Sequence, residues 1–427
     1  MQIQDLYSIF LSHPSIQTDT RKIKPGDLFF ALKGPNFNGN QFAEQALNSG
    51  AAYAIIDEPV DFTDERLVSS TNSLQTLQNL AKYHREQFNI PFIAITGSNG
   101  KTTTKELMHE VLSSTYITYT TKGNLNNHIG VPLTILSVKE DAQMAVIEMG
   151  ANHQQEIESY CRYTLPTHGI ITNCGKAHLE GFGGVEGVKK GKGELFDYLR
   201  ANGGTAFIMN DYDYLQEMSK GIKEIITYGT ANASITGAAD KNGEFLQVNL
   251  TGADGQQTIH TQLIGEYNLP NVLAAIAVGK YFNVDESKIK QALENYTPSN
   301  SRSQLISKGS NKIILDAYNA NPTSMKAAIE NFANMEEKDK ILLLGGMMEL
   351  GNDSIAEHAG IVKLIDQYKW KSVVLVGGDF QKVPHRYTYF NQAAEVKDWL
   401  KTQHFENATL LVKGSRSMQM EKVIEEL

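Results

Sequence analysis

The chain has 427 residues, 41% of them hydrophobic, and a formal net charge of −9. Its length favours two or three domains, and its acidic balance argues against nucleic acid as a partner, because nucleic-acid-binding proteins carry a basic excess. No apolar run approaches the roughly 18 residues of a membrane span, no secretion signal opens the chain, and only Cys161 and Cys174 are present, so we expect a cytoplasmic protein without disulfides or membrane insertion.

The first predicted domain covers residues 1–88 and has an α/β pattern. Two apolar runs of strand length, GDLFFALKG (26–34) and AAYAIID (51–57), flank a predicted helix that ends at Gly50. A polar helix, SLQTLQNLAKYHREQF (73–88), then leads to the next region.

The second predicted domain covers residues 89–297. Strand-length apolar runs alternate with helical patterns, which predicts a parallel sheet with crossover helices. From about residue 233 three alternating segments joined by the turns KNG (241–243) and ADG (253–255) predict a small antiparallel patch, followed by a helix over 268–282. The apolar runs are PFIAITG (91–97), QMAVIEMG (143–150), HGIITNCG (168–175), TAFIMND (205–211) and EIITYG (224–229).

The third predicted domain covers residues 298–427 and begins in the polar linker NYTPSNSRS (295–303). Strands and helices alternate again, which predicts a Rossmann-like α/β domain. We expect strands at 312–318, 340–346, 371–378 and 408–414, and helices from Thr323, from Ser354, near Gln392 and from Ser415.

The segment AITGSNGKTTTKEL (94–107) reads as a buried strand, a glycine turn and a helix. Gly97 and Gly100 allow a sharp bend whose N–H groups, with the helix N-terminus, can hold a phosphate. Lys101 can reach a phosphate oxygen, and the hydroxyl of Thr102 suits Mg²⁺. The alternative is a plain strand-to-helix turn with a capping Thr. The spacing departs from the standard G-x-x-x-x-G-K-[ST] loop, because Ile95 stands at the first glycine position.

The segment from Thr96 to Thr102 resembles the variant phosphate loop T-G-[ST]-x-G-K-[ST] of the Mur ligases, the ATP-dependent amide-bond-forming enzymes of peptidoglycan synthesis. The resemblance extends over nearly the whole chain and implies a central ATP-binding domain. It implies that the nucleotide contacts Thr96, Gly97, Ser98, Asn99, Gly100, Lys101, Thr102 and Thr103.

Three further side chains are implied to act in catalysis with Lys101. Glu148, in VIEMGANH, and His178, in GKAHLEGFGG, match family motifs that bind two Mg²⁺ ions together with Thr102, although alone they would read as an ordinary Glu and a structural His. Lys192, in VEGVKKGKGELF, matches the lysine that the family converts to a carbamate with CO₂. Lys190 competes for this assignment, and a solvated basic helix face is the alternative.

The resemblance also implies residues for the rest of the nucleotide. Asn268 and Asn271 match asparagines near the adenine, with Tyr267 where His is usual, and a helix N-cap is the alternative for Asn268. Asp316, in LDAYNANP, matches an Asp that contacts the ribose. Arg302 matches an Arg that reaches the γ-phosphate, or is an ordinary linker residue.

The first domain resembles the family's UDP-sugar-binding module, through TDTRKIKPGDLFFALKGPNFNGNQF (18–42). This implies that UDP contacts Thr20, Arg21 and Asn38, although Asn38 and Asn40 replace an Asp and a His of the usual D-G-H. In the third domain Gly346 replaces the Asp of L-G-D-M-x-E-L-G.

The motifs YNANP and EMGANH point to the family branch that adds D-alanyl-D-alanine to UDP-N-acetylmuramoyl tripeptide through an acyl phosphate. We expect a monomer that uses ATP and two Mg²⁺ ions. Another amide ligase of the superfamily, a P-loop kinase or NTPase, and a nucleotide-binding module without catalysis are the alternatives.

Overall fold

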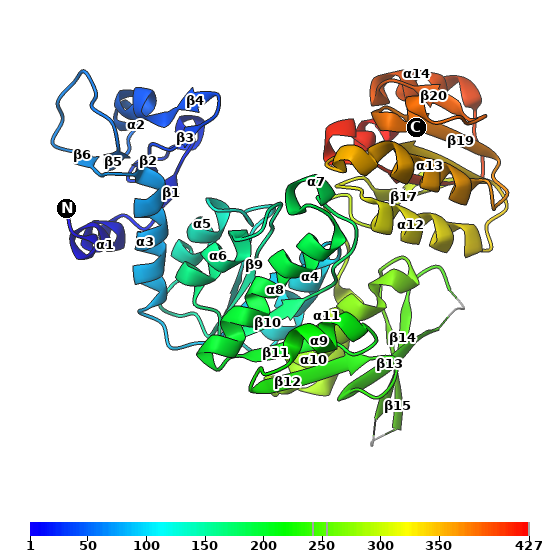
Figure 1. Cartoon of the computed structure of the whole chain (residues 1–427), viewed down its shortest axis with the longest axis horizontal. Coiled ribbons are helices and arrows are strands. Elements are labelled where there is room, and N and C mark those ends of the chain that lie inside the picture. Colours follow the sequence, from blue (N-terminus) through cyan, green and yellow to red (C-terminus); the bar gives the residue numbers. More distant parts are fainter. Residues whose placement is uncertain (241–242, 253–254, 426–427) are drawn as a thin grey trace.

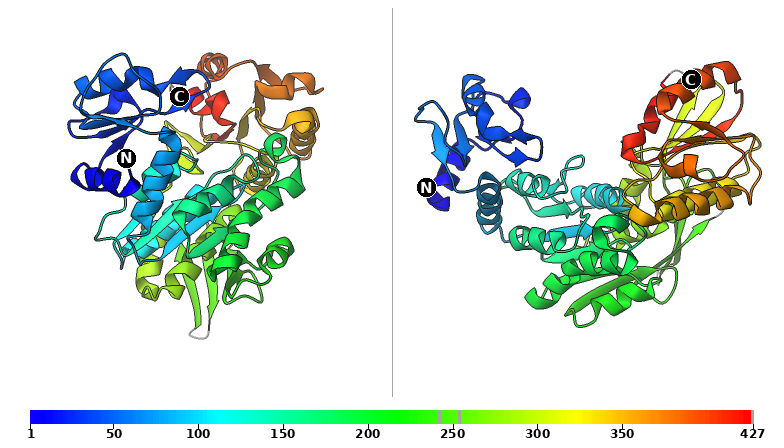
Figure 2. Two further views of the ribbon diagram at one scale, coloured as in Figure 1. Left: turned by 60° about the vertical axis from the view of Figure 1, so that its left-hand side comes forward. Right: turned by 45° about the horizontal axis from the view of Figure 1, so that its top comes forward.

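The computed structural model describes residues 1–240, 243–252 and 255–425, and these form three α/β modules (Figure 1). The N-terminal and C-terminal modules rise from opposite ends of the central module, on the same side of it, and stand apart from each other (Figure 2). Within the described residues, no helix combines the length and apolar character needed to cross a membrane.

The N-terminal module is a four-stranded parallel sheet in the order β1-β2-β5-β6. The two predicted apolar runs form its central strands, β2 and β5, because their side chains are buried on both faces. The elements are α1 Ile3–Ser12, β1 Ile16–Gln17, η1 Thr20–Lys22, β2 Leu28–Phe30, β3 Lys33–Gly34, β4 Phe37–Asn38, η2 Gly39–Phe42, α2 Ala43–Asn48, β5 Tyr53–Ile56 and β6 Leu67–Ser69.

The polar helix α3 (Ser73–Arg85) fastens this module to the central one. Its buried His84 contacts the hydroxyl of Tyr7 at 3.1 Å and the carbonyl of Val138 at 2.8 Å, and burial lowers the pKa of the imidazole. Arg85 donates to the carbonyl of Thr164 at 3.0 Å. Helix α3 therefore packs on both sides of the expected boundary at residue 88, which stays a prediction.

The central module is built on a nine-stranded sheet in the order β15-β14-β13-β12-β11-β10-β7-β9-β8. Strand β7 lies between β9 and β10, with Ile95 beside Glu148 and Thr96 beside Ile171, so the carboxyl ends of all three strands meet at one edge. A ligand site is expected at such an edge.

The predicted antiparallel patch is confirmed. Strands β13, β14 and β15 pair antiparallel, and β13 also pairs parallel with β12, so the patch extends the main sheet. The turns expected at 241–243 and 253–255 lie mostly outside the described residues. The elements of the central module are β7 Phe92–Thr96, α4 Lys101–Ser113, β8 Thr118–Thr120, α5 Gly130–Leu136, β9 Met144–Glu148, α6 Glu156–Thr164, β10 His168–Ile171, α7 Leu179–Phe182, α8 Val185–Asn202, β11 Thr205–Met209, α9 Asp213–Ser219, β12 Glu224–Gly229, β13 Ile235–Asp240, β14 Gln247–Gly252, β15 Gly255–His260, η3 Glu266–Asn268, α10 Leu269–Tyr281 and α11 Glu286–Asn295.

The C-terminal module has a six-stranded sheet in the order β16-β17-β21-β18-β19-β20, parallel except for β16. The four predicted strands and three of the four predicted helices are present. Its elements are β16 Gln304–Lys308, β17 Asn311–Asp316, α12 Pro322–Asn334, β18 Lys340–Gly345, η4 Gly351–Asp353, α13 Ser354–Ile365, β19 Ser372–Val376, η5 Gly378–Lys382, β20 Thr388–Phe390, α14 Ala393–Gln403, β21 Thr409–Lys413, η6 Arg416–Met418 and η7 Met420–Ile424.

The helix expected from Ser415 is wrong in its form. The segment makes two short 3₁₀ helices, η6 and η7, with Gln419 between them in the left-handed conformation at φ +50°. Met420 is fully buried, and its side chain occupies the space that Cβ atoms on Gly345 and Gly414 would need. The left-handed backbone of Gln419 ends the first helical turn, so one continuous helix cannot form.

Gly346, at the position where the related motif has Asp, touches backbone. A Cβ atom there would lie 2.6 Å from the Cα of Gly378. We therefore expect Gly346→Ala to lower the free energy of unfolding by about 1–3 kcal/mol through overpacking, measured by urea titration.

Gly360 in α13 is the matched control, because a Cβ there meets no described atom within 4 Å. Gly360→Ala should raise the free energy of unfolding by roughly 0.5–1 kcal/mol, since alanine favours a helix interior over glycine. Equal effects of the two substitutions would contradict the packing argument.

Candidate active site

A cavity of about 1020 Å³ lies where the edge formed by β7, β9 and β10 faces the C-terminal module. Most of the predicted site residues meet there although they are far apart in sequence. Those that line it are Ser98, Asn99, Gly100, Lys101, Thr102, Thr103, Glu148, His178, Asn268, Asn271, Arg302 and Asp316.

The bend between β7 and α4 is held by the segment that follows β10. Thr96 and Gly97 lie behind the cavity wall, and the N–H of Ser98 donates to the carbonyl of Asn173 at 2.9 Å. The hydroxyl of Thr172 donates to the carbonyl of Asn99 at 2.6 Å. A Cβ on Gly97, whose φ is +143°, would lie 2.0 Å from that hydroxyl oxygen, so only glycine fits.

Helix α4 begins without a side-chain cap in the described chain. Its N-cap is Gly100, at φ +81°, and the hydroxyl of Thr102 donates instead to Glu148 at 3.1 Å. The alternative of a turn with a capping Thr is therefore wrong. The uncapped N–H groups and the helix dipole favour an anion at this end of α4.

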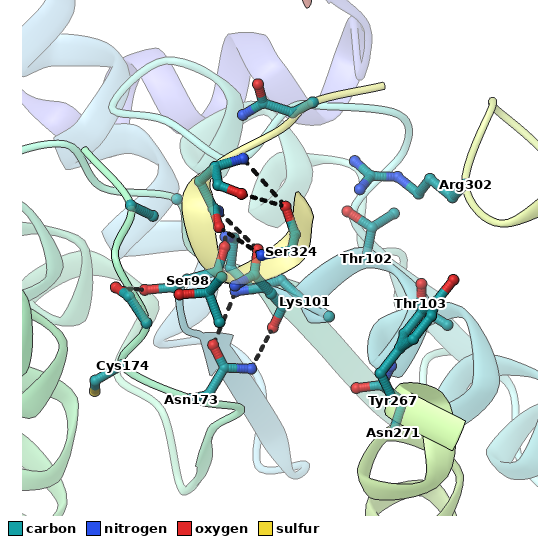
Figure 3. Close-up of a pocket in the computed structure, with 18 of the residues that line it drawn as sticks. Ser98, Lys101, Thr102, Thr103, Asn173, Cys174, Tyr267, Asn271, Arg302 and Ser324 are labelled. Atoms are coloured by element: carbon teal, nitrogen blue, oxygen red, sulfur yellow. Dashed lines mark hydrogen bonds between the residues drawn. The ribbon is translucent and has the colours of Figure 1, made fainter. Parts of the chain in front are cut away.

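Lys101 is half-buried at the same end. Its ammonium donates to the carbonyl of Gly97 at 2.6 Å. Burial lowers the pKa of Lys101, while the carboxylate of Glu148 opposes this shift and Arg302 adds to it. In Figure 3 the side chains of Thr102, Thr103 and Arg302 lie on one side of the bend and that of Cys174 on the other.

Glu148, at the end of β9, has one carboxylate oxygen to spare. Its Oε1 accepts from Thr102 and, at 2.8 Å, from the amide of Asn126. Its Oε2 is buried and finds no hydrogen-bond partner among the described residues. Across the described chain, no three His, Cys, Asp or Glu side chains form a metal cluster. One carboxylate and one hydroxyl still fit Mg²⁺, which takes few protein ligands and completes its shell with water and phosphate oxygens.

His178 lies at the start of α7 in the left-handed conformation, at φ +52°. Its Nδ1 contacts a carboxylate oxygen of Glu349, which belongs to the C-terminal module. Both side chains line the cavity. The structure therefore joins the central and C-terminal modules at this histidine.

Lys192 in α8 is 1% exposed, whereas Lys190 is exposed. Burial therefore favours Lys192 over Lys190 as the lysine expected to form the carbamate. A solvated basic face does not describe it. Its Nζ donates to the carbonyl of Ala151 at 2.9 Å and lies 4.9 Å from the ring centroid of Phe182. Burial, and secondarily the charge of Lys101, lower the pKa of Lys192 to about 7. Lys192 lies behind the cavity wall, to which Ala151 belongs.

Two asparagines at the start of α10, Asn268 before it and Asn271 within its first turn, join this helix to α4. Asn271 donates to Asn268 Oδ1 at 2.8 Å and accepts from the hydroxyl of Thr104 at 3.1 Å. Asn268 stands at the N-cap position, yet its side chain donates to the carbonyl of Ile264. Asn268 is therefore the N-cap residue of α10 by position, but its side chain does not cap the helix.

Asp316 and Arg302 reach the cavity from the C-terminal module. Asp316, at the end of β17, pairs with the buried Lys413 at 2.5 Å. The guanidinium of Arg302 stacks 3.8 Å from the ring centroid of Tyr318, and its buried Nε lacks a hydrogen-bond partner within the described structure. An ordinary solvated linker arginine would have neither feature.

None of the described residues that line the cavity comes from the N-terminal module. Thr20 lies in η1, where Arg21 pairs with Asp19 at 2.8 Å and is otherwise exposed. Asn38 donates to Glu58 at 2.5 Å and accepts from the amide of Asn40. The structure therefore does not bring the expected UDP residues to the bend between β7 and α4.

Five residues without a role predicted from the sequence also shape this site. Tyr318, Asn321 and Glu349 lie in motifs that the sequence shows, but each of the five acts through a partner that is distant in sequence. Asn321, the N-cap of α12, donates to Asn99 at 2.7 Å and so links the C-terminal module to the bend. The five are Asn126, Tyr318, Asn321, Glu349 and Lys413.

We expect Gly97→Ala to displace the bend, because the added methyl would overlap Thr172, and to weaken nucleotide binding at least tenfold. Fluorescence titration with a labelled ATP analogue measures this. Gly309→Ala is the control, since Gly309 also has a positive φ (+58°) but no described atom within 4 Å of its Cβ position. If both variants bind as the wild type does, the bend is not the phosphate site.

Three family models match the chain in succession. Residues 14–94 match "Mur ligase family, catalytic domain", residues 95–279 match "Mur ligase middle domain", and residues 301–416 match "Mur ligase, glutamate ligase domain". Together they span all three modules.

Full-length relatives and solved structures agree. The UDP-N-acetylmuramoyl-tripeptide--D-alanyl-D-alanine ligase of Bacillus subtilis is 33% identical, over 96% of this chain and 92% of the relative, and that of Escherichia coli is 35% identical, over 97% and 93%. A crystal structure of MurF from Acinetobacter baumannii superimposes with a TM-score of 0.90 at 30% identity, over 100% and 98% of the two chains. MurF from Thermotoga maritima, in complex with ADP, has the same fold, with a TM-score of 0.87 at 24% identity over 97% of each chain. The chain belongs to the Mur ligase family.

Proposed function

We propose that this protein joins D-alanyl-D-alanine to UDP-N-acetylmuramoyl tripeptide with the hydrolysis of ATP to ADP and phosphate. The reaction is the one that the names of the Bacillus subtilis and Escherichia coli relatives state. The observation that carries the proposal is the phosphate bend at Gly97–Gly100, with Lys101 and the open carboxylate oxygen of Glu148 in one cavity.

The chemistry explains why a ligase needs such a cavity. A carboxylate is a poor acyl donor, so an oxygen of the tripeptide carboxylate takes the γ-phosphoryl group of ATP, and ADP leaves. The amine of D-alanyl-D-alanine then attacks the acyl carbon, the C–O bond to phosphate breaks, and the amine loses a proton. Lys101 and the N–H groups of the bend stabilise charge on the transferring phosphoryl group, and holding both substrates together supplies much of the rate.

Two Mg²⁺ ions would be held in this site, one by Thr102 and Glu148 and one by His178 and a carbamate on Lys192. Bound Mg²⁺ supplies charge neutralisation at phosphate and carboxylate oxygens. The buried, unpartnered Oε2 of Glu148 supports the first position. Asn268, Asn271 and Asp316 would hold the adenosine, and Arg302 the γ-phosphate.

The carbamate is supported by the state of the Lys192 amine. With a pKa of about 7, much of this amine is neutral at neutral pH, and its lone pair can add to CO₂ with loss of a proton. An exposed lysine has a pKa near 10.4 and would be almost entirely protonated. The product is an anion that can ligate a cation.

The N-terminal module would hold the UDP end of the substrate through Thr20, Arg21 and Asn38. Because this module stands apart from the C-terminal one, a single substrate would connect them, and we infer that the modules close on it. We also propose a monomer, with its three modules bounded near residues 88 and 297, and a cytoplasmic location, which two free cysteines suit.

The first test is release of phosphate from ATP. We expect release only when both UDP-N-acetylmuramoyl tripeptide and D-alanyl-D-alanine are present, and a loss of kcat of at least 100-fold in Lys101→Ala, comparable to removing one oxyanion donor. Lys190→Ala is the matched control and should keep wild-type activity.

The same assay separates the alternatives. Another amide ligase of the superfamily would respond to a different amine or acceptor, and a kinase would leave a stable phosphorylated product. A binding module would release nothing. Phosphate release without the tripeptide would refute the proposal.

The carbamate gives a pH-dependent prediction. With ¹³C-labelled CO₂ held at constant dissolved concentration, a carbamate signal should grow as the pH rises through about 7, because only the neutral Lys192 amine reacts and protonation removes it below that value. The signal, observed by ¹³C NMR, should vanish in Lys192→Ala and persist in Lys190→Ala. A signal that is independent of Lys192 would contradict the assignment.

A further inference from the structure

Asn126, in the loop between β8 and α5, shares one oxygen of Glu148 with Thr102. The side-chain amide of Asn126 donates to Oε1 at 2.8 Å, and the hydroxyl of Thr102 donates to the same oxygen at 3.1 Å. Glu148 is 1% exposed, and its Oε2 is buried without a hydrogen-bond partner among the described residues. Two donors therefore converge on one carboxylate oxygen, and the other oxygen receives none.

This uneven pairing is unfavourable for a buried carboxylate unless a ligand completes it. A buried polar atom that has lost water without gaining a partner costs free energy, and most such atoms in native proteins are paired. Glu148 and Asn126 both line the cavity. The open oxygen is therefore suited to a positively charged ligand that enters from the cavity.

The backbone around Asn126 restricts where its amide can lie. Its carbonyl accepts the N–H of Gly150 at 2.7 Å, and its own N–H donates to the carbonyl of Asn124 at 2.8 Å. A Cβ atom on Gly150 would lie 3.0 Å from the side-chain amide of Asn126, so the glycine permits this close approach. Gly150 follows Glu148 by two residues, so the segment that carries the carboxylate also holds the loop that carries the amide.

The rest of the loop is fixed by contacts of its own. A Cβ atom on Gly130 would lie 2.3 Å from the backbone of Leu125, so the loop packs directly on the start of α5. The side chain of Asn127 accepts the N–H of Gly130 at 2.9 Å, and the hydroxyl of Thr134 donates to the carbonyl of Gly130 at 2.9 Å. None of these contacts involves Glu148, so they can be changed separately from the Asn126 bond.

We propose that Asn126 is a positioning residue that holds Oε1 of Glu148, so that Oε2 stays directed at the cation of the Thr102–Glu148 position. This inference rests on the proposed function, which places Mg²⁺ there. Carboxylates that bind metals are commonly oriented by such outer hydrogen bonds. The hydroxyl of Thr102 fits the same arrangement, because its proton points to Oε1 while its oxygen lone pairs remain for the cation.

The amide matters because one donor alone does not fix the carboxylate. The terminal torsion of a glutamate is broad, so with only the Thr102 hydroxyl in place the carboxylate plane could turn. Oε2 would then no longer be held toward one point. Loss of Asn126 should therefore weaken cation binding and leave the phosphate bend intact.

The test measures Mn²⁺ binding to the full chain with a non-hydrolysable ATP analogue, by electron paramagnetic resonance of free Mn²⁺. In Asn126→Ala one bound ion should lose roughly 10–100-fold in affinity. The analogue alone, titrated in EDTA, should bind as it does to the wild type. Unchanged Mn²⁺ affinity would overturn the proposal, and so would an equal loss of analogue affinity in EDTA, because the variant would then have disturbed the bend.

A double-mutant cycle assigns the affected ion to Glu148. Glu148→Gln should weaken one ion, since a neutral amide replaces a charged ligand. Adding Asn126→Ala to this variant should cause no further loss, because the Asn126 amide acts only through the carboxylate. Losses that add would refute the inference.

Thr134→Val is the matched control. It removes the hydroxyl that holds the loop at Gly130, keeps the shape of the side chain and does not touch Glu148. We expect Mn²⁺ affinity to stay as in the wild type. An equal loss in Thr134→Val would mean that Asn126 acts only by shaping the loop, which would overturn its positioning role.

Turnover provides a readout that a purely structural defect would not show. In Asn126→Ala the Mg²⁺ concentration for half-maximal turnover should rise, and excess Mg²⁺ should restore kcat. A kcat that excess Mg²⁺ leaves low would count against the inference. A wild type that turns over with both substrates while Asn126→Ala binds Mn²⁺ normally refutes this inference alone, whereas a wild type without turnover refutes the proposed function.

Discussion

The site depends on one steric constraint, the absence of a Cβ atom at both ends of the bend between β7 and α4. A Cβ atom on Gly97 would lie 2.0 Å from the side-chain oxygen of Thr172. A Cβ atom on Gly100 would lie 2.5 Å from the side-chain oxygen of Asn271. The bend is therefore clamped between the segment after β10 and the start of α10. Neighbouring segments therefore fix the conformation of this four-residue bend, together with its own glycines.

The bend also contacts the C-terminal module. Asn99, in the middle of the bend, receives a hydrogen bond from Asn321, which also caps α12. A shift of the bend would thus displace the start of α12, which lines the cavity through Thr323 and Ser324. Asp316 is held on that side by the buried Lys413. The same residues consequently form both the interface between the two modules and the wall of the cavity.

Local patterns in the sequence predict the modules, because buried parallel strands are continuous apolar runs and the bend has its own glycines and lysine. They do not predict what depends on distant packing. Lys190 and Lys192 are alike in the sequence, and only the position of α8 buries one of them. Likewise nothing near Glu349 indicates a contact with His178, and nothing near Gln419 indicates that its backbone is left-handed, at φ +50°, between two short 3₁₀ helices. Each of these needs a partner that the chain brings in from another element.

Lys101 and Lys192 are close enough for their positive charges to repel each other, and Lys192 is fully buried, so their pairing is electrostatically unfavourable. Lys101 and Lys192 each lose solvation, and the charge of Lys101 lowers the pKa of Lys192 further. A carbamate at Lys192 reverses the sign of this interaction, because repulsion between two cations becomes attraction between a cation and an anion. Lys101 would then hold its proton more firmly, which is the state it needs to stabilise a phosphoryl group. The proposed modification would thus turn repulsion between the two lysines into attraction that supports Lys101, the residue proposed to contact phosphate.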